Sequence, residues 1–127
     1  MEDPDFPVEL RRFIQAAIPE PEAAELLVLL HKQPDKAWNA EQLTDALRPS
    51  VVAPAQVQRH LDAFHARGVL ALDEQGYRYA PQDNNAALVE QLVKVYNERP
   101  VTLIRMIYAL KDTRIQSFAD AFKFRKE

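Results

Sequence analysis

The sequence has 127 residues, of which 47% are hydrophobic and 28% charged, with a formal net charge of -3 at pH 7 and no cysteine. This composition is typical of a single soluble helical domain, and the missing cysteines exclude disulfides, thiol catalysis and thiolate metal sites. No stretch approaches the roughly 20 apolar residues of a membrane span. Because the acidic start MEDPDFP also lacks the pattern of a signal peptide, we expect a cytoplasmic protein.

The first third of the chain predicts two helices separated by prolines. After a loose arm of residues 1–6, apolar side chains at helical spacing predict a short helix over residues 8–18, which Pro19 and Pro21 end. Residues 22–32 predict a second helix that is apolar nearly all round, with acids in its first turn and basic residues in its last. We therefore expect this second helix to lie buried at the centre of the fold.

A third, short helix is predicted over residues 40–47. Asn39 followed three residues later by Gln42 has the form of an N-terminal capping box, and Pro49 ends the helix. Trp38 lies in the extended link before this helix, and we expect its side chain to pack into the core.

Residues 53–80 predict an amphipathic helix that passes directly into a two-stranded hairpin. Apolar residues recur at helical spacing from Val57 to Phe64, and Gly68 ends the helix because glycine tolerates the left-handed backbone of a helix C-terminus. Two short strands follow, joined by a turn over residues 73–76 in which a glycine supplies the positive φ.

Three further helices are predicted after the hairpin. Asn84 or Asn85 caps the first, which Pro100 ends or kinks, and the second covers about residues 101–110. Asp112 or Thr113 caps the third. These helices carry more apolar surface than a small core needs, so we expect part of it to form a homodimer, although the helices could instead complete a monomeric core or bind another protein. The residues assigned to the dimer contact are Leu92, Tyr96, Leu103, Ile107, Phe118 and Phe122.

The expected fold is mainly α with a small β-hairpin (α+β), in three segments: an N-terminal arm and helix (1–21), a central domain (22–82) and a C-terminal helical extension (83–127). The order helix, short strand, helix, helix, hairpin in the central segment resembles the winged helix-turn-helix fold of small bacterial transcriptional regulators. AEQLTDAL corresponds to the positioning helix and APAQVQRHLDAFHARGVL to the recognition helix. The residues that match the packing of the recognition helix onto the hairpin are Leu61, Phe64, Gly68, Val69 and Leu70.

The resemblance implies a transcriptional regulator that reads the major groove of double-stranded DNA with residues 53–67. Base edges would be read by polar side chains in the first half of this helix, and flanking cations and hydroxyls would contact phosphates. The predicted DNA-binding residues are Arg48, Ser50, Gln56, Gln58, Arg59, His60, Arg67 and Arg78.

Several acids oppose this function. Asp62 lies on the same helix, and Asp73 and Glu74 occupy the hairpin turn, where a wing that contacts DNA would favour Lys or Arg. The alternative is a winged-helix protein–protein interaction module that does not bind DNA and uses the acidic wing and the apolar C-terminal helices. A small-molecule sensor with a pocket between the core and these helices stays open, without a residue signature.

No enzyme is predicted. His31, His60 and His65 lie on different helices or helix faces, so they do not form a metal or proton-transfer site. Asp62 and His65 are three residues apart and could pair, but no nucleophile or second base accompanies them. The sequence also has no glycine-rich phosphate loop. We therefore expect a non-enzymatic protein without a cofactor or metal.

Overall fold

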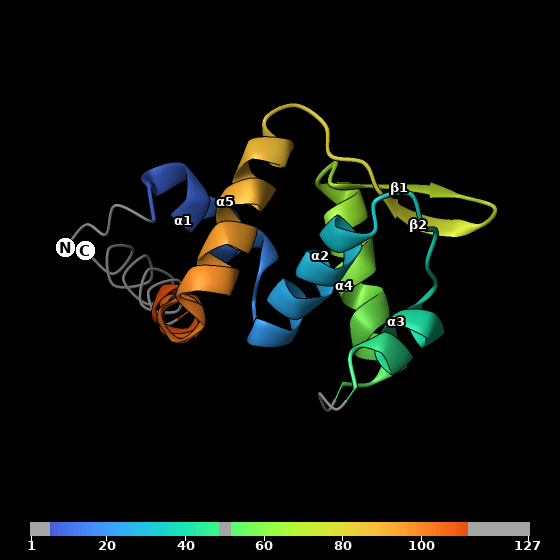
Figure 1. Ribbon diagram of the computed structural model, residues 1–127, viewed down its shortest axis with the longest axis horizontal. Helices are drawn as coiled ribbons and strands as arrows, with labels where there is room; N and C mark the ends of the chain where they lie inside the picture. The colour runs from blue at the N-terminus through green and yellow to red at the C-terminus, as the bar shows by residue number, and fades with distance from the viewer. Residues whose placement is uncertain (1–5, 49–51, 112–127) are drawn as a thin grey trace, which may run out of the picture.

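The computed structural model describes residues 6–48 and 52–111, which form a mainly helical fold with one small antiparallel sheet (Figure 1). The predicted mainly α fold with a hairpin is confirmed at this level. The predicted helix that begins at Asp112 or Thr113 lies outside the described residues. The elements in chain order are α1 (Val8–Ala17), α2 (Pro21–Lys32), α3 (Ala40–Ala46), α4 (Pro54–Ala66), β1 (Leu70–Asp73), β2 (Gly76–Tyr79), α5 (Asn85–Glu98) and a further helix over residues 100–111.

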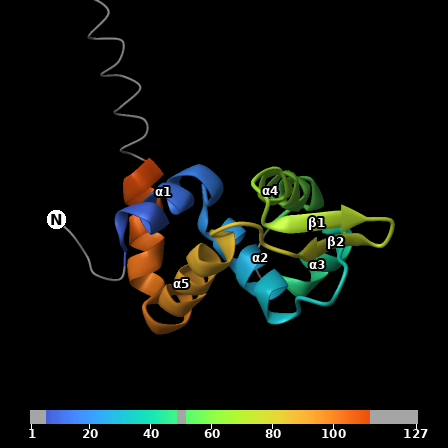
Figure 2. The same cartoon turned by 90° about the horizontal axis from the view of Figure 1, so that it is seen from above.

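The described residues form an elongated body with different elements at its two ends. Two perpendicular views agree that the hairpin and α3 lie at one end, whereas α1 and helix 100–111 lie at the other (Figures 1 and 2). α2 lies between the ends and packs against α4, α5 and β2. The hairpin end is therefore separated from the C-terminal helix by the body of the fold.

α2 is the central helix, which confirms the prediction for residues 22–32. Pro21 occupies its first turn, where the missing N–H is not needed, and His31 and Lys32 occupy its last turn, where the helix dipole favours cations. Six of its side chains are buried, because apolar residues occupy nearly every side of the helix.

The predicted capping box at the start of α3 is confirmed. The backbone N–H of Gln42 donates to Asn39 Oδ1 at 2.8 Å, and the backbone N–H of Asn39 donates to Gln42 Oε1 at 3.0 Å. Two amides at the helix N-terminus thereby gain acceptors, which makes this seven-residue helix possible despite its short length.

Trp38 connects the link before α3 to the hairpin. Its backbone exchanges two hydrogen bonds of 2.8 Å with Tyr77, and its indole is buried, as expected. Gly76 closes the turn with φ +133, and a Cβ at this position would lie 2.5 Å from the carbonyl oxygen of Trp38. The glycine is required both by its backbone angle and by this close approach.

Asn85, at the start of α5, forms a hydrogen bond to the end of α4, which the sequence did not predict. Gly68 ends α4 with φ +81, and Asn84 takes the N-cap position of α5 without a side-chain cap hydrogen bond. The side-chain amide of Asn85 instead donates to the carbonyl oxygen of Arg67 at 2.9 Å. The side chain therefore satisfies a carbonyl at the end of α4 and does not cap its own helix.

One hydrophobic core includes residues from all three predicted segments. Phe6, expected in a loose arm, is 1% exposed and belongs to this core, because its ring packs with the apolar faces of the helices. α5 ends at Glu98, and Pro100 begins the next helix, whose Leu103 and Ile107 are buried. Across residues 6–48 and 52–111, no helix is both long and apolar enough to cross a bilayer.

Candidate nucleic-acid interface

α4 carries the side chains that the sequence assigns to base reading, and its buried face determines how they are presented. Val57, Leu61 and Phe64 are fully buried, and the helix packs closely against α3 and β1. Ala55 and Arg59, one turn apart, are exposed on another side of the helix. This solvent-facing side is the part of α4 that a DNA groove could approach.

Glu20, in the link between α1 and α2, binds two of the predicted base-reading side chains. Nε2 of Gln56 donates to Glu20 Oε1, and Nε2 of His60 donates to the same oxygen at 2.7 Å. His60 is only 7% exposed. Gln56 and His60 therefore connect α4 to the α1–α2 link through hydrogen bonds. Both side chains point away from the solvent-facing side of α4.

The Glu20 carboxylate is stabilised in its charged form. Partial burial raises its pKa, but the hydrogen bonds from Gln56 and His60 and the nearby charge of Arg59 outweigh burial and leave the pKa below its ordinary value. Glu20 is therefore ionised at neutral pH and offsets part of the positive charge beside α4.

The hairpin holds the third predicted base-reading side chain, Gln58. Its Nε2 donates to Asp62 Oδ1 at 2.9 Å and lies 3.0 Å from the hydroxyl oxygen of Tyr77. The Tyr77 hydroxyl in turn donates to Asp62 Oδ1 at 2.7 Å. Two successive turns of α4 are thus connected to β2 by one hydrogen-bonded group.

This group keeps a negative charge on α4. The hydrogen bond from Tyr77, followed by the one from Gln58, holds the pKa of Asp62 below its ordinary value. The same contact with Asp62, together with burial, raises the pKa of Tyr77. Asp62 is exposed, so its carboxylate presents a full charge to any polyanion that approaches the helix.

Arg59 lies beside a hollow that the sequence did not reveal. The hollow has a volume of about 350 Å³ and is lined by Arg59, His60, Glu20 and Lys111, with small residues of α1 and α4. Lys111 was not predicted to lie near α4, because only the packing of the whole chain brings the end of helix 100–111 there. Its lining therefore includes two basic side chains, Arg59 and Lys111, and one carboxylate, Glu20.

Two of the residues predicted to contact phosphate, Arg48 and Arg67, lie at opposite ends of the packed helices α3 and α4. Arg48, two residues after the end of α3, is exposed, and its Nη2 lies 3.3 Å from Asp45 Oδ1. Arg67, at the end of α4, is exposed and its guanidinium carbon lies 5.8 Å from the centre of the Phe13 ring. Ser50 lies outside the described residues.

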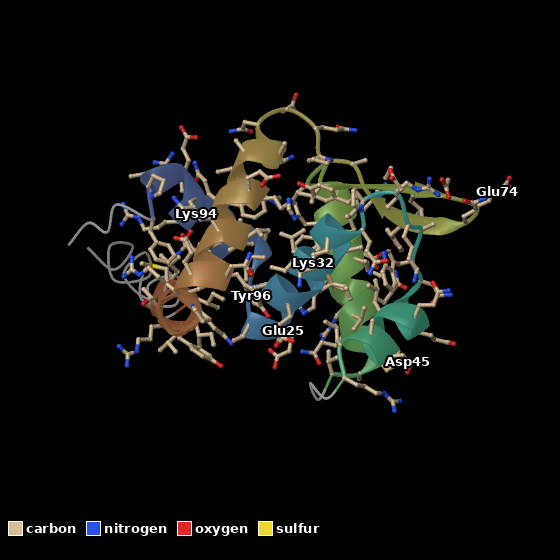
Figure 3. All side chains as sticks on the ribbon, in the orientation of Figure 1. Glu25, Lys32, Asp45, Glu74, Lys94 and Tyr96 are labelled. Carbon is tan, nitrogen blue, oxygen red and sulfur yellow. The ribbon has the colours of Figure 1, made fainter. Side chains whose placement is uncertain are left out.

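The hairpin turn is acidic, and Arg78 beside it contacts Asp73 and Gln75. Arg78 Nη2 lies 3.6 Å from Asp73 Oδ2 and donates to Gln75 Oε1 at 3.0 Å. The backbone N–H of Gln75 donates to the other oxygen of Asp73 at 2.8 Å. Glu74 projects from the outer tip of the hairpin (Figure 3). This turn therefore presents carboxylates where a phosphate-binding wing would present cations.

Most of the described residues assigned to a dimer contact lie inside the chain itself. Leu92, Leu103 and Ile107 are 0 to 2% exposed, and Tyr96 is partly buried against the core. Phe118 and Phe122 lie outside the described residues. The spacing of apolar residues in the sequence predicts these helices, but it does not distinguish the residues that face the core from those that face solvent.

Within residues 6–48 and 52–111, no group of three His, Asp or Glu side chains is arranged to hold a metal ion. His31 pairs with Glu90 at 2.8 Å, far in sequence from His60 and its partner Glu20.

Comparison of the chain with protein-family models, curated proteins and solved structures finds no match.

Proposed function

We propose that the chain is a DNA-binding regulator of the winged-helix type, with α4 as its recognition helix. Support comes from how the elements pack: α3 and α4 form a close pair, the hairpin follows α4 directly, and Trp38 pairs with β2, which lies between Trp38 and β1. The observation that carries the proposal is the exposed Arg59, one turn after the start of α4 and close to the end that enters the major groove in such proteins.

The proposal gives the α4 side chains different roles from those expected from sequence. Arg59 is the base-reading residue, since an arginine makes a two-pronged contact with guanine. Exposed Ala55 and Ala63 lie one turn before and after it, and their methyl groups suit contact with thymine. Gln56 and His60 position the helix through Glu20.

Phosphate contacts in this proposal come from Arg48 and Arg67, which lie exposed at the two ends of the α3–α4 pair. The hairpin contributes little, because Arg78 is engaged by Asp73. Asp62 repels phosphate. Few cations therefore act at once, so we expect binding of modest affinity with a shallow salt dependence.

The test is titration of labelled duplex DNA, random and genomic, at low and moderate salt. Wild-type protein should bind more weakly as salt rises. Arg59→Ala should lower affinity by about tenfold to a hundredfold, the effect of losing about 1 to 3 kcal/mol of base contact. The matched control is Arg12→Ala, an exposed arginine on α1, which should bind like the wild type. No binding at low salt, or equal effects of the two variants, would overturn the proposal.

A second function, association with a protein through helix 100–111, is favoured by one observation. Val101, Ile104 and Tyr108 are exposed large hydrophobic side chains on this helix. Such association needs no cation on α4. A chain that associates through this helix but shows no salt-dependent DNA binding would have the second function alone.

A further inference from the structure

The hollow beside Arg59 lies where three separate parts of the chain meet: α1 with the link after it, α4, and the end of helix 100–111. Its polar lining residues are Glu20, Arg59, His60 and Lys111. Its volume of about 350 Å³ lies in the range of roughly 300 to 1,000 Å³ that is usual for small-molecule sites. We call this space the Arg59 hollow.

The lining of the Arg59 hollow carries an excess of positive charge. Within residues 6–48 and 52–111, no carboxylate forms an ion pair with Arg59 or Lys111. The carboxylate of Glu20 feels the charge of Arg59 but uses its Oε1 to accept hydrogen bonds from Gln56 and His60. Because two cations share a concave site with one carboxylate that is already hydrogen-bonded, the hollow attracts anions.

Hydrogen bonds hold the walls of the Arg59 hollow together. Nε2 of Gln15 donates to the carbonyl oxygen of Leu110 at 3.1 Å, which joins α1 to the helix turn that carries Lys111 (Figure 2). On the other side, Glu20 joins the α1–α2 link to α4 through its hydrogen bonds with Gln56 and His60, and α1 packs against α4. The two cations are therefore carried by elements that are already fixed to one another, so a ligand does not have to order them.

The rest of the lining is small and apolar. Ala16 and Ala17 contribute it from α1, Pro19 from the link and Ala63 from α4. None of these side chains offers a hydrogen bond, so they suit an apolar body whose charged end contacts the cations. A single inorganic ion would contact only the charged part of the lining.

We propose that the Arg59 hollow binds a small organic anion with an apolar body and a carboxylate or phosphate-ester head group. The head group lies between Arg59 and Lys111, because a guanidinium donates two parallel hydrogen bonds to such oxygens and an ammonium adds a further charged donor. The apolar body lies against Ala16 and Ala63.

The anion also regulates DNA binding, and this step rests on the proposed function, in which Arg59 reads a base. The donors of one guanidinium cannot contact the anion and a guanine at the same time. The anion therefore lowers the affinity for DNA, and DNA lowers the affinity for the anion by the same factor. Binding of the anion itself requires no DNA.

Calorimetric titration of the full chain with benzoate and with phenyl phosphate tests the site. At least one of them should bind, and the tighter of the two identifies the head group. Benzamide, which lacks the charge, and inorganic phosphate, which lacks the apolar body, should each bind about tenfold more weakly or worse. No binding of either aromatic anion, or equally tight binding of benzamide or inorganic phosphate, overturns the inference.

Variants locate the site. Arg59→Gln and Lys111→Gln should each raise the dissociation constant of the tighter anion about tenfold to a hundredfold, because each removes a charged donor. The matched control is Lys94→Gln, which removes the same charge from an exposed position on α5 and should leave the constant unchanged (Figure 3). Equal effects of Lys94→Gln and Lys111→Gln would assign binding to net charge and overturn the inference.

Ala16→Phe keeps every charge and fills the hollow from α1, so it should abolish anion binding. Circular dichroism establishes that each variant is folded. Unchanged anion binding by folded Ala16→Phe protein would place the anion elsewhere and overturn the inference.

Titration of labelled duplex DNA with and without the tighter anion tests the regulatory step. The anion should weaken DNA binding by the wild type and leave DNA binding by Ala16→Phe unchanged. A chain that binds the anion but no DNA overturns the proposed function and leaves the site standing. A chain that binds DNA but no anion overturns the site alone, and equal DNA affinity with and without saturating anion overturns the regulatory step.

Discussion

Oε1 of Glu20 lies 2.7 Å from Nε2 of the buried His60, and this contact joins the α1–α2 link to the middle of α4. The same oxygen accepts a hydrogen bond from Gln56, one turn earlier on the helix. One carboxylate thus fixes two turns of the proposed recognition helix against the N-terminal part of the fold.

Glu20→Gln tests how much this anchor stabilises the fold. The folded-state pKa of Glu20 is lowered, so its charge stabilises the fold above the ordinary glutamate pKa of 4.5, and this contribution is lost as the pH falls through the folded value. At pH 7 we expect the variant to lose about 1 to 2 kcal/mol in urea unfolding. The difference should shrink in acid, where wild-type Glu20 becomes protonated.

Glu74→Gln serves as the control for Glu20→Gln, because Glu74 is exposed at the tip of the hairpin. Its unfolding free energy should equal that of the wild type at both pH values. A Glu20→Gln variant whose deficit grows on acidification would contradict the anchor.

The apolar period of α4 was enough to predict the helix and its buried face, since Val57, Leu61 and Phe64 recur at helical spacing. It could not predict which polar residues face solvent. Gln56 and His60 look like surface residues in the sequence, yet their partner Glu20 lies 36 and 40 residues away. Such contacts depend on how distant parts of the chain pack, so the spacing of residues within α4 cannot predict them.

Asp62→Asn tests the charge balance of α4. The lowered pKa of Asp62 keeps it ionised at neutral pH, so the substitution removes one full negative charge. Asparagine keeps an oxygen that can accept the hydrogen bond from Tyr77. We therefore expect DNA affinity to rise by roughly threefold to tenfold at low salt, and the gain to shrink as salt screens it.

Titration of Glu98→Gln provides the comparison for Asp62→Asn. This exposed glutamate ends α5, so its removal changes the net charge of the chain equally but not the charge on α4. An equal rise in affinity for both variants would assign the effect to net charge and would argue against α4 as the contact surface.

Gly76→Ala tests the contact between the hairpin and the Trp38 link. Alanine at φ +133 would be strained, and its Cβ would meet the Trp38 carbonyl oxygen at 2.5 Å. We expect a loss of about 2 kcal/mol or more in unfolding free energy and a red shift in fluorescence, because the only tryptophan of the chain would become more exposed.

Gly68→Ala separates the two causes of the expected loss at Gly76, which are the backbone strain at positive φ and the close approach to Trp38. Gly68 also has positive φ, at +81, but the nearest atom to an added Cβ is Gln82 Oε1 at 3.4 Å, in a flexible side chain. Its cost should be about 1 kcal/mol, without a change in fluorescence. Equal costs at the two glycines would show that the close approach to Trp38 contributes nothing.

Local chemistry predicted the helix ends well where both partners lie within one turn. The Asn39–Gln42 capping box could be recognised from spacing, because each side chain bonds the backbone three residues away. Asn84 and Asn85 look equally suited to begin α5. Only the fold brings Asn85 to the end of α4, so its role could not be recognised from spacing.

Asn85→Ala and Asn84→Ala form a matched pair that tests this role. Asn85 Nδ2 donates to the Arg67 carbonyl oxygen at 2.9 Å, whereas Asn84 makes no side-chain cap hydrogen bond at the start of α5. Loss of the Asn85 amide leaves a carbonyl at the end of α4 without this donor, so Asn85→Ala should lower the free energy of unfolding by about 1 kcal/mol. Asn84→Ala should change it by less than about 0.5 kcal/mol. Urea unfolding of both variants measures the difference, and a larger loss at Asn84 would show that the asparagines act as ordinary caps of α5.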